Sequence, residues 1–362
     1  SNTVKFNGTT TSVLTATTTV LTANVPAGAT NGPISVTVAG VTATSASNFT
    51  VGVGGAPTLS SFSPAVGNYG ATVTLTGTNY DTTPSNNRVA FAGAIGAVAT
   101  ATSTTITVPV PGSAQTGFLS VATPQGQATS ATEFFVAPTG VVAADIQYTG
   151  RITVNGSTVA ASIPTANKNG LMVFDGVAGQ RINIGFSGVT VTQFKATVYR
   201  PDGVAMNTSP TFGTVGGSID LPVLPMTGTY TIVLDPVSTY TGNITVTVST
   251  ELTGSITPGG AAVPITIARV GQNARYTFSG TAGQTVSAQL SAVTISSGYV
   301  SILNPDGSTL VAPSSFGTGG SVIDSQVLPT TGTYAILIDP SVTYTGNVTV
   351  TLYNVADVTG TI

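Results

Sequence analysis

Histidine and cysteine are absent from this chain, and charged residues make up only 6% of its 362 positions. Without histidine, the chain cannot build a Ser-His-Asp triad or a histidine metal site. Without cysteine, it can form neither a disulfide nor a thiolate metal site. The net charge of −3 offers no basic surface to a phosphate backbone, so we expect no nucleic-acid partner.

Groups that act as general bases or activate a nucleophile are scarce as well. Glutamate occurs only at Glu133 and Glu251, which are far apart in the sequence. A glycosidase with paired carboxylates would therefore have to use aspartates. Because enzymes need such groups close to a substrate, this shortage leads us to expect no enzyme within these residues.

Long apolar runs and the charged residues of helix surfaces are also missing. No apolar run approaches the roughly 18 residues that a membrane helix requires, so we expect no membrane insertion. The first ten residues carry neither the basic nor the apolar region of a signal peptide. Hydrophobic residues nonetheless make up 41% of the chain, which is rich in threonine, valine and glycine. This composition is typical of an all-β fold with many turns.

The most regular pattern is Leu224–Val248, which returns as Leu328–Leu352, 104 positions further on. From Thr229, threonine alternates with tyrosine and isoleucine, and this two-residue period predicts a strand with one buried face. Pro236 is expected to end the strand, because proline cannot donate a ladder hydrogen bond. A second alternating run begins at Ile244, so each copy predicts two strands joined by a turn.

Two internal repeats organise the whole chain. One has a period of 85 residues, matching 4–8 to 89–93, and its second copy has a front half, 57–85, that the first copy lacks. The other has a period of 104 residues and runs without a gap from about 149 to 250. These repeats predict five segments: a partial module at 1–52, a complete one at 56–137, β-sandwich repeats at 141–250 and 251–356, and the start of a further repeat at 357–362.

Both ends of the chain fall inside repeats, which leaves two explanations open. The residues are either a piece of a longer repetitive chain, whose adjacent modules are partners, or a neighbouring copy supplies the missing strands by donor-strand pairing. Short links between modules, such as 137–140, favour a rod-like array over a flexible string.

Residues 57–64 (PTLSSFSP), 70–80 (GATVTLTGTNY) and 89–91 (VAF) resemble the IPT/TIG family of immunoglobulin-like domains. The resemblance covers about 57–136 in full and 1–51 in part. It implies an Ig-like β-sandwich for the first pair of modules.

The later modules are similar to bacterial pre-peptidase C-terminal β-sandwiches, through TGTY at 227–230 and again at 331–334. Tandem arrays of this kind resemble those of large exported bacterial proteins, of the Rhs type or adhesin-like. The resemblance implies an extracellular or bacterial cell-surface location but no activity, since sandwich folds host many functions. We therefore expect an all-β chain of tandem β-sandwich modules, Ig-like then jelly-roll-like, in a rod-like array.

Aspartates recur once per module and allow two interpretations. Asp202 and Asp220 in one copy correspond to Asp306 and Asp324 in the next. Recurrence in a repeat indicates turn chemistry. The alternative is a Ca²⁺ site, which needs six to eight oxygen ligands, although no local DxDxDG cluster is present. Calcium is the one cofactor that the sequence leaves open.

Tyr240 and Tyr344 are the candidate ligand-binding residues, on loops beside the final strand of each repeat. A tyrosine there could stack on a sugar ring and so bind a glycan. The alternative is a ring that covers the end of the sandwich, with its hydroxyl in water.

The surface composition suggests a structural role. Natural sheets guard their edges with charge and proline, whereas strand faces here are mostly uncharged threonine, serine and alanine. We therefore expect self-association into a homopolymer or sheet, as a segment of a bacterial surface filament, coat or stalk. The alternatives are an adhesin that binds glycan or a cell surface, and a spacer region of a large Rhs-type secreted protein.

Overall fold

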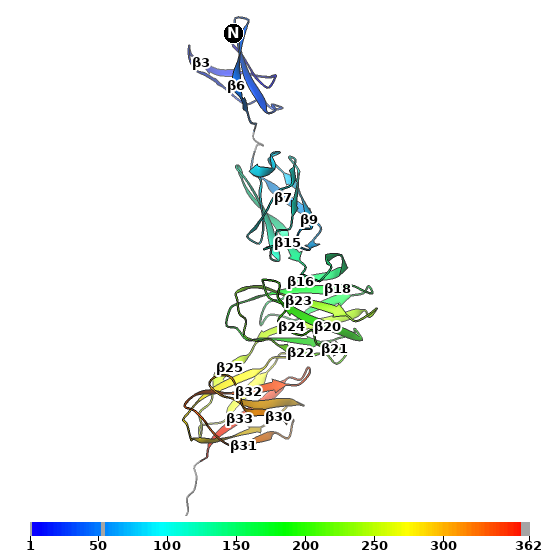
Figure 1. Ribbon diagram of the computed structural model, residues 1–362, viewed down its shortest axis with the longest axis vertical. Coiled ribbons are helices and arrows are strands. Elements are labelled where there is room, and N and C mark those ends of the chain that lie inside the picture. Colours follow the sequence, from blue (N-terminus) through cyan, green and yellow to red (C-terminus); the bar gives the residue numbers. More distant parts are fainter. Residues whose placement is uncertain (1, 52–54, 356–362) are drawn as a thin grey trace, which may run out of the picture. The chain divides into compact units, whose positions relative to one another are not determined.

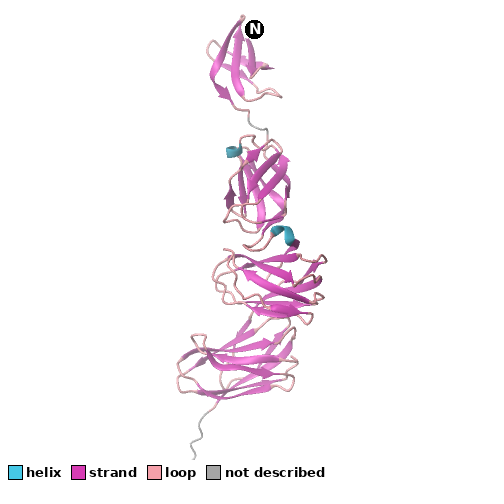
Figure 2. Ribbon diagram, turned by 45° about the vertical axis from the view of Figure 1, so that its right-hand side comes forward, coloured by secondary structure: helices cyan, strands magenta, loops and turns pink. Residues whose placement is uncertain are grey.

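The computed structural model describes residues 2–51 and 55–355, and nearly all of its ordered elements are β-strands (Figure 1). The helical elements of this part are two short 3-10 turns, η1 (Pro84–Asn86) and η2 (Ala143–Asp145), drawn in cyan in Figure 2. No helix among the described residues is long and apolar enough to span a membrane. The all-β fold is therefore confirmed, while the predicted repeat start at 357–362 lies outside the described residues.

The chain packs into two compact units whose boundary runs through the second module. The first unit comprises 1–64, 72–111 and 118–133, and the second comprises 65–71, 112–117 and 134–362. One end of the second module and both later modules thus belong to the same compact unit.

The N-terminal module is a single sheet with a small core. The sheet, in the order β2-β1-β5-β6, and the hairpin β3-β4 consist of β1 (Asn2–Phe6), β2 (Thr9–Thr11), β3 (Val13–Ala16), β4 (Leu21–Ala23), β5 (Gly32–Val38) and β6 (Val41–Phe49). Val4 and Phe6 are buried, and the Phe6 and Phe49 rings meet edge to face at 5.0 Å. Val41, in contrast, is 76% exposed. A four-stranded sheet with no second large sheet on it among the described residues buries few side chains.

The module at 57–136 closes two sheets over a larger core. One has the order β11-β10-β14-β15-β8 and the other β12-β13-β9-β7. Their strands are β7 (Thr58–Ser63), β8 (Val66–Gly67), β9 (Thr72–Thr78), β10 (Arg88–Phe91), β11 (Ala94–Gly96), β12 (Thr100–Ala101), β13 (Thr105–Pro109), β14 (Gly117–Thr123) and β15 (Gly126–Val136). Leu75 and Ile106 from one sheet and Phe91 and Val121 from the other are fully buried. The predicted Ig-like sandwich is therefore present here.

The two later modules are β-sandwiches with the same strand order. A five-stranded sheet packs on a four-stranded one: β16-β18-β23-β20-β21 on β17-β24-β19-β22, then β25-β27-β32-β29-β30 on β26-β33-β28-β31. In each, the first strand runs parallel to the second strand of its sheet. The 104-residue repeat in sequence is thus a repeat of topology.

The strands of the first sandwich are β16 (Ile146–Arg151), β17 (Val159–Ile163), β18 (Asn169–Gly176), β19 (Ile182–Ser187), β20 (Gln193–Tyr199), β21 (Thr211–Gly213), β22 (Gly217–Asp220), β23 (Gly228–Pro236) and β24 (Gly242–Thr250). Those of the second are β25 (Leu252–Ser255), β26 (Val263–Ile267), β27 (Ala274–Gly280), β28 (Thr285–Ser291), β29 (Gly298–Leu303), β30 (Thr309–Phe316), β31 (Ser321–Val327), β32 (Gly332–Pro340) and β33 (Gly346–Asn354). Each sandwich therefore has nine strands around one core.

A buried tyrosine stands in the core of each sandwich. The Tyr230 ring stacks on Phe174 with centroids 5.3 Å apart, and Tyr334 stacks on Phe278 at 5.4 Å. Facing aromatic pairs of this kind add stability beyond the area they bury. Gly176, which pairs with the first residue of β23, leaves space for the tyrosine ring. A Cβ at Gly176 would lie only 2.9 Å from Tyr230 Cε2.

One prediction about the central strand is wrong in part. Besides its inward Tyr230 and Leu234, β23 also buries its outward Thr231 and Val233, which are 8% and 4% exposed. The strand therefore has two buried faces, because the preceding module lies over the outer one. The strand ends at Pro236, as expected for proline.

Candidate functional site

Two of the four candidate aspartates lie in β-turns. The Gly203 amide donates to the Arg200 carbonyl at 2.9 Å, and the Arg200 guanidinium donates to both Asp202 carboxylate oxygens, at 3.0 and 2.7 Å. The Arg200 hydrogen bond holds the pKa of Asp202 below its usual value. In the corresponding turn, Asp306 accepts from the Ser308 hydroxyl at 2.6 Å and its amide at 2.9 Å, which lowers the pKa of Asp306. Both carboxylates are thus engaged in local turn contacts.

The other two candidate aspartates lie on strands. Asp220 at the end of β22 accepts a hydrogen bond from Asn183 Nδ2 at 2.7 Å, and burial raises the pKa of Asp220. Asp324 is exposed on β31. Within 2–51 and 55–355, no group of three or more His, Cys, Asp or Glu side chains could hold a metal ion. The structure does not gather the four aspartates into a metal cluster there, and calcium binding stays a prediction.

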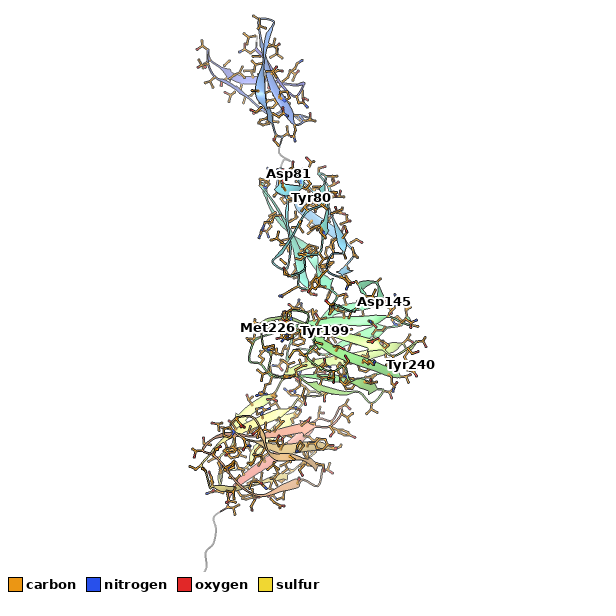
Figure 3. All side chains as sticks on the ribbon, viewed as in Figure 1. Tyr80, Asp81, Asp145, Tyr199, Met226 and Tyr240 are labelled. Atoms are coloured by element: carbon orange, nitrogen blue, oxygen red, sulfur yellow. The ribbon has the colours of Figure 1, made fainter. Side chains whose placement is uncertain are left out.

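The two candidate tyrosines occupy equivalent loops. Tyr240 lies between β23 and β24 at one end of its sandwich (Figure 3), and Tyr344 lies between β32 and β33. Their side chains are 38% and 42% exposed, so both rings are open to solvent. Stacking of a sugar on these rings stays a prediction.

The structure also reveals two junctions between modules, whose residues the repeats alone did not single out. At the first junction, Phe135 and Ala137 at the end of β15 pack on Leu171 and Val173 of β18. Leu171 and Val173 are fully buried on the outer face of the five-stranded sheet. This face is therefore covered by another module.

An asparagine fixes the same junction by hydrogen bonds. Asn68 Nδ2 donates to the Val141 carbonyl at 2.7 Å, and its Oδ1 accepts from the Ala143 amide at 3.0 Å. A side chain that satisfies main-chain groups on both of its polar atoms sets the orientation of the segment that leads into β16. The link between the two modules is thus held in place.

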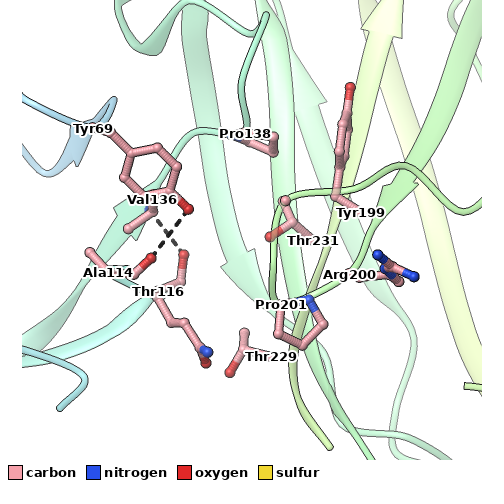
Figure 4. A pocket seen from close by; sticks show the side chains of 12 residues that line it. Tyr69, Ala114, Thr116, Val136, Pro138, Tyr199, Arg200, Pro201, Thr229 and Thr231 are labelled. Atoms are coloured by element: carbon pink, nitrogen blue, oxygen red, sulfur yellow. Dashed lines mark hydrogen bonds between the residues drawn. The ribbon is translucent and has the colours of Figure 1, made fainter. Parts of the chain in front are cut away.

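A narrow cleft opens beside this junction (Figure 4). Tyr69 and Thr116 line one wall, and Tyr199, Thr229 and Thr231 line the other. The space measures about 20 Å³, roughly enough for one water molecule. It is too small for a sugar ring, so this cleft belongs to the junction.

The second junction brings the backbones of the two sandwiches together. Gly185 on β19 lies so close to Val270 that a Cβ at Gly185 would overlap the Val270 carbonyl oxygen. A Cβ on Gly271, whose φ is +74°, would lie 2.8 Å from the Gly185 Cα. On β24, beside Gly185 on the same outer face, Thr247 and Ser249 are 1% and 0% exposed. The close approach therefore requires glycine at position 185.

Polar side chains of the second sandwich cap main-chain carbonyls of the first. The Arg269 guanidinium donates to the Gly156 carbonyl at 2.7 Å and to the Val248 carbonyl at 3.2 Å. Gln272 Nε2 donates to the Thr250 carbonyl at 2.9 Å. Because the donors of a guanidinium form a rigid fork, these bonds define one arrangement of the two sandwiches.

Carboxyl groups from both sandwiches meet at this junction. The Asn273 amide donates to Asn183 Oδ1 at 3.2 Å, next to the bond from Asn183 to Asp220. Burial, followed by the repulsion of Asp220, raises the pKa of Asp339 in the second sandwich to about 7. Asp339 therefore keeps its proton to a higher pH than an ordinary aspartate.

Two sequence signals could have revealed these junctions. The unbroken apolar run Leu171–Phe174 is typical of a strand buried on both faces, whereas the corresponding Arg275–Phe278 alternates. Arg275 on this second strand pairs with Glu251 at 2.6 Å. At the other junction, Gly185 interrupts an apolar strand where the repeat has Gln289, and glycine inside a strand often marks a close backbone approach.

The second sandwich carries a larger hollow, which we call the hydroxyl groove. It measures about 300 Å³ and lies beside the edge strand β25. It is lined by Ser255, Ile256, Thr257, Pro258, Thr277, Phe278, Ser279 and Thr333. None of these side chains is charged.

Solved structures similar to the chain share little sequence with it. An auxiliary nutrient-binding protein from Bacteroides ovatus is 15% identical over 30% of this chain, with a TM-score of 0.22. This chain spans only 22% of that protein. SGBP-B of a Bacteroides ovatus mixed-linkage glucan utilization locus, solved with a heptasaccharide, is 15% identical over 97% of this chain and 88% of its own, with a TM-score of 0.20.

A further structure, solved with a xylogluco-oligosaccharide, is 12% identical over 96% of this chain and 93% of its own, with a TM-score of 0.30. Similarity at these levels does not carry the ligands of those proteins over to this chain. A comparison with curated proteins gives no match. The resemblance of the later modules to pre-peptidase C-terminal sandwiches, and of the array to Rhs-type proteins, therefore stays a prediction. Residues 57–136 match the family model of the IPT/TIG domain. The module at 57–136 is therefore an IPT/TIG domain, and two β-sandwiches of one topology follow it in the chain.

Proposed function

We propose that residues 57–355 serve as a spacer of fixed geometry in a bacterial extracellular or cell-surface protein, joining adjacent modules of a longer chain. The observation that carries the proposal is the junction between the two sandwiches. There Gly185 admits the backbone of the next module, and Arg269 donates to three of the first sandwich's carbonyls. A flexible string of domains has no need of such contacts.

The energetics of this junction favour a fixed arrangement. Separating the sandwiches would break the hydrogen bonds of Arg269 and Gln272. Relative motion is the usual expectation for domains with small polar interfaces. Close-packed backbones with a partly buried guanidinium instead restrict the junction to a narrow range of angles.

The filament, coat and adhesin hypotheses remain compatible with a spacer. A filament or coat requires modules that keep a fixed arrangement under mechanical force. An adhesin requires modules that hold its binding site at a distance from the cell. A specific observation favours one further activity, glycan binding, and this is the hydroxyl groove of the second sandwich.

The spacer proposal predicts a narrow distribution of distances between the two sandwiches. The chain lacks cysteine, so spin labels can be attached through Ala178→Cys and Ala282→Cys, two exposed and equivalent positions. We expect double electron-electron resonance to give a single sharp distance. Gly185→Gln, which introduces the residue found at the equivalent position of the repeat, should broaden it.

The matched control is Gln289→Gly, at the equivalent strand position of the second sandwich, which should leave the distance unchanged. Circular dichroism would verify that each variant keeps its strands. A broad distribution in the otherwise unaltered chain would overturn the proposal, whatever the variants do.

A further inference from the structure

The hydroxyl groove combines a polar rim with an apolar base. Ser255, Thr257 and Ser279 are exposed around it, while Ile256 and Phe278 below are only 4% and 2% exposed. Together with Thr277 and Thr333, five hydroxyl groups face the same space of about 300 Å³. This volume is at the lower limit of ligand pockets in proteins.

The first sandwich shows what normally occupies this position. Ser255 pairs with Thr277 in the register in which Arg151 pairs with Val173, so the two sites correspond strand for strand. In the first sandwich, Arg151 Nη1 and Asp175 Oδ2 form an ion pair at 2.7 Å.

Thr229 completes that network, because its hydroxyl donates to Asp175 Oδ1 at 2.8 Å. In the second sandwich, the arginine and aspartate are replaced by Ser255 and Ser279, whereas the threonine is retained as Thr333. A long charged side chain and a short charged one are thus exchanged for two short, uncharged serine side chains. The hydroxyl groove is the space that this exchange opens.

We propose that the hydroxyl groove binds a neutral saccharide. Each serine and threonine hydroxyl can donate one hydrogen bond and accept two, which suits the hydroxyl groups of a sugar. The partly exposed ring of Pro258 offers an apolar surface to the C–H groups of the same sugar.

Other ligand classes fit this lining less well. An acidic sugar or phosphate would find no cationic side chain among the lining residues. A purely apolar ligand would bury the hydroxyls without partners, which costs free energy. This inference does not rest on the spacer proposal, since it concerns the surface of one sandwich only.

The test is binding of the full chain to an array of neutral and acidic glycans, followed by isothermal titration with a neutral oligosaccharide that binds. We expect binding to neutral glycans. The double variant Ser255→Arg with Ser279→Asp restores the ion pair of the first sandwich and should weaken the affinity at least tenfold. Because that pair is compatible with the fold of the first sandwich, the variant should keep the melting temperature of the unaltered chain.

The matched control is Arg151→Ser with Asp175→Ser, which removes two charges from the first sandwich and should leave the affinity for the neutral glycan in place. Three outcomes would overturn the proposal. These are binding to no glycan, binding to acidic glycans only, and neutral-glycan binding that survives the double variant at 255 and 279. None of them bears on the distance measurement that tests the spacer.

Discussion

The buried hydroxyl groups of three tyrosines differ in their partners. Those of Tyr230 and Tyr334 donate to the carbonyls of Met226 and Thr330, four residues earlier, at 2.7 and 2.6 Å. The hydroxyl of Tyr80, in the IPT/TIG domain, is buried without a partner in the described structure, and burial raises the pKa of Tyr80 to about 12. An unpaired buried hydroxyl costs free energy, whereas a paired one stabilises.

This difference predicts opposite effects of the same substitution. Tyr334→Phe should lower the free energy of unfolding by about 1 kcal/mol, because it removes a hydrogen bond. Tyr80→Phe should leave stability unchanged or raise it, because it removes only an unsatisfied group. Scanning calorimetry of the full chain would measure both. Equal losses in the two variants would contradict this account.

At the scale of elements, the outer faces of the sheets decide how the modules meet. The five-stranded sheet of the first sandwich presents Leu171 and Val173 to the preceding module. The four-stranded sheet presents Gly185 and Asp220 to the following one. Strands with the same place in the topology thus carry different residues on their outer faces, according to what covers them.

The junction between the sandwiches should depend on pH through Asp339. Its pKa is raised from 3.8 to about 7 by burial and by Asp220, so the folded state holds a proton that the unfolded state has lost. The folded protein therefore binds more protons between about pH 4 and 7, and stability falls as pH rises through this range. Above about pH 7, Asp339 is ionised in both states, and its contribution to stability at low pH is fully lost.

Asp339→Asn should abolish most of this decline and stabilise the second sandwich at pH 8 by about 1–3 kcal/mol. Melting temperatures at pH 5 and pH 8 would measure the effect. Asp324→Asn, on an exposed strand position, is the control and should leave the decline unchanged. If the Asp339→Asn variant lost as much stability between these pH values as the unaltered chain, Asp339 would not be the responsible group.

At the scale of the whole molecule, several edge strands expose apolar side chains. Val41 on β6 is 76% exposed and Val327 on β31 is 62% exposed, and both strands lie at the end of their sheets. β6 carries no charged residue and β31 only Asp324, and edge strands with little charge are templates for pairing with another chain. The hypothesis of self-association therefore remains a prediction that can be tested.

We expect the sedimentation coefficient of the chain to increase with protein concentration. Val41→Lys combined with Val327→Lys should shift this increase to roughly tenfold higher concentration, because lysine on an edge opposes strand pairing. Thr165→Lys, on an exposed loop, adds a charge elsewhere and should have little effect. A chain that stays monomeric at high concentration would contradict the filament and coat hypotheses.

Local patterns determined much of this protein. The alternation after Thr229 and its return 104 residues later predicted the strands, and the repeat predicted two copies of one topology. The recurrence of Asp202 predicted turn chemistry, and the hydrogen bond from Gly203 to Arg200 closes a turn there. These features depend on backbone conformation and on side-chain spacing within a few residues, so a single stretch of sequence carries them.

Only the tertiary structure decided which faces are covered and where the surface is hollow. Thr231 and Val233 were expected on an open face and are buried, because a different module packs on them. Asp220 looked like its counterpart Asp324 in the sequence, yet Asp220 accepts a hydrogen bond from Asn183, where the repeat has Ser287. The hydroxyl groove likewise arises where β25, β27 and β32 meet. Burial and cavities depend on contacts between segments far apart in the chain, and no local pattern contains that information.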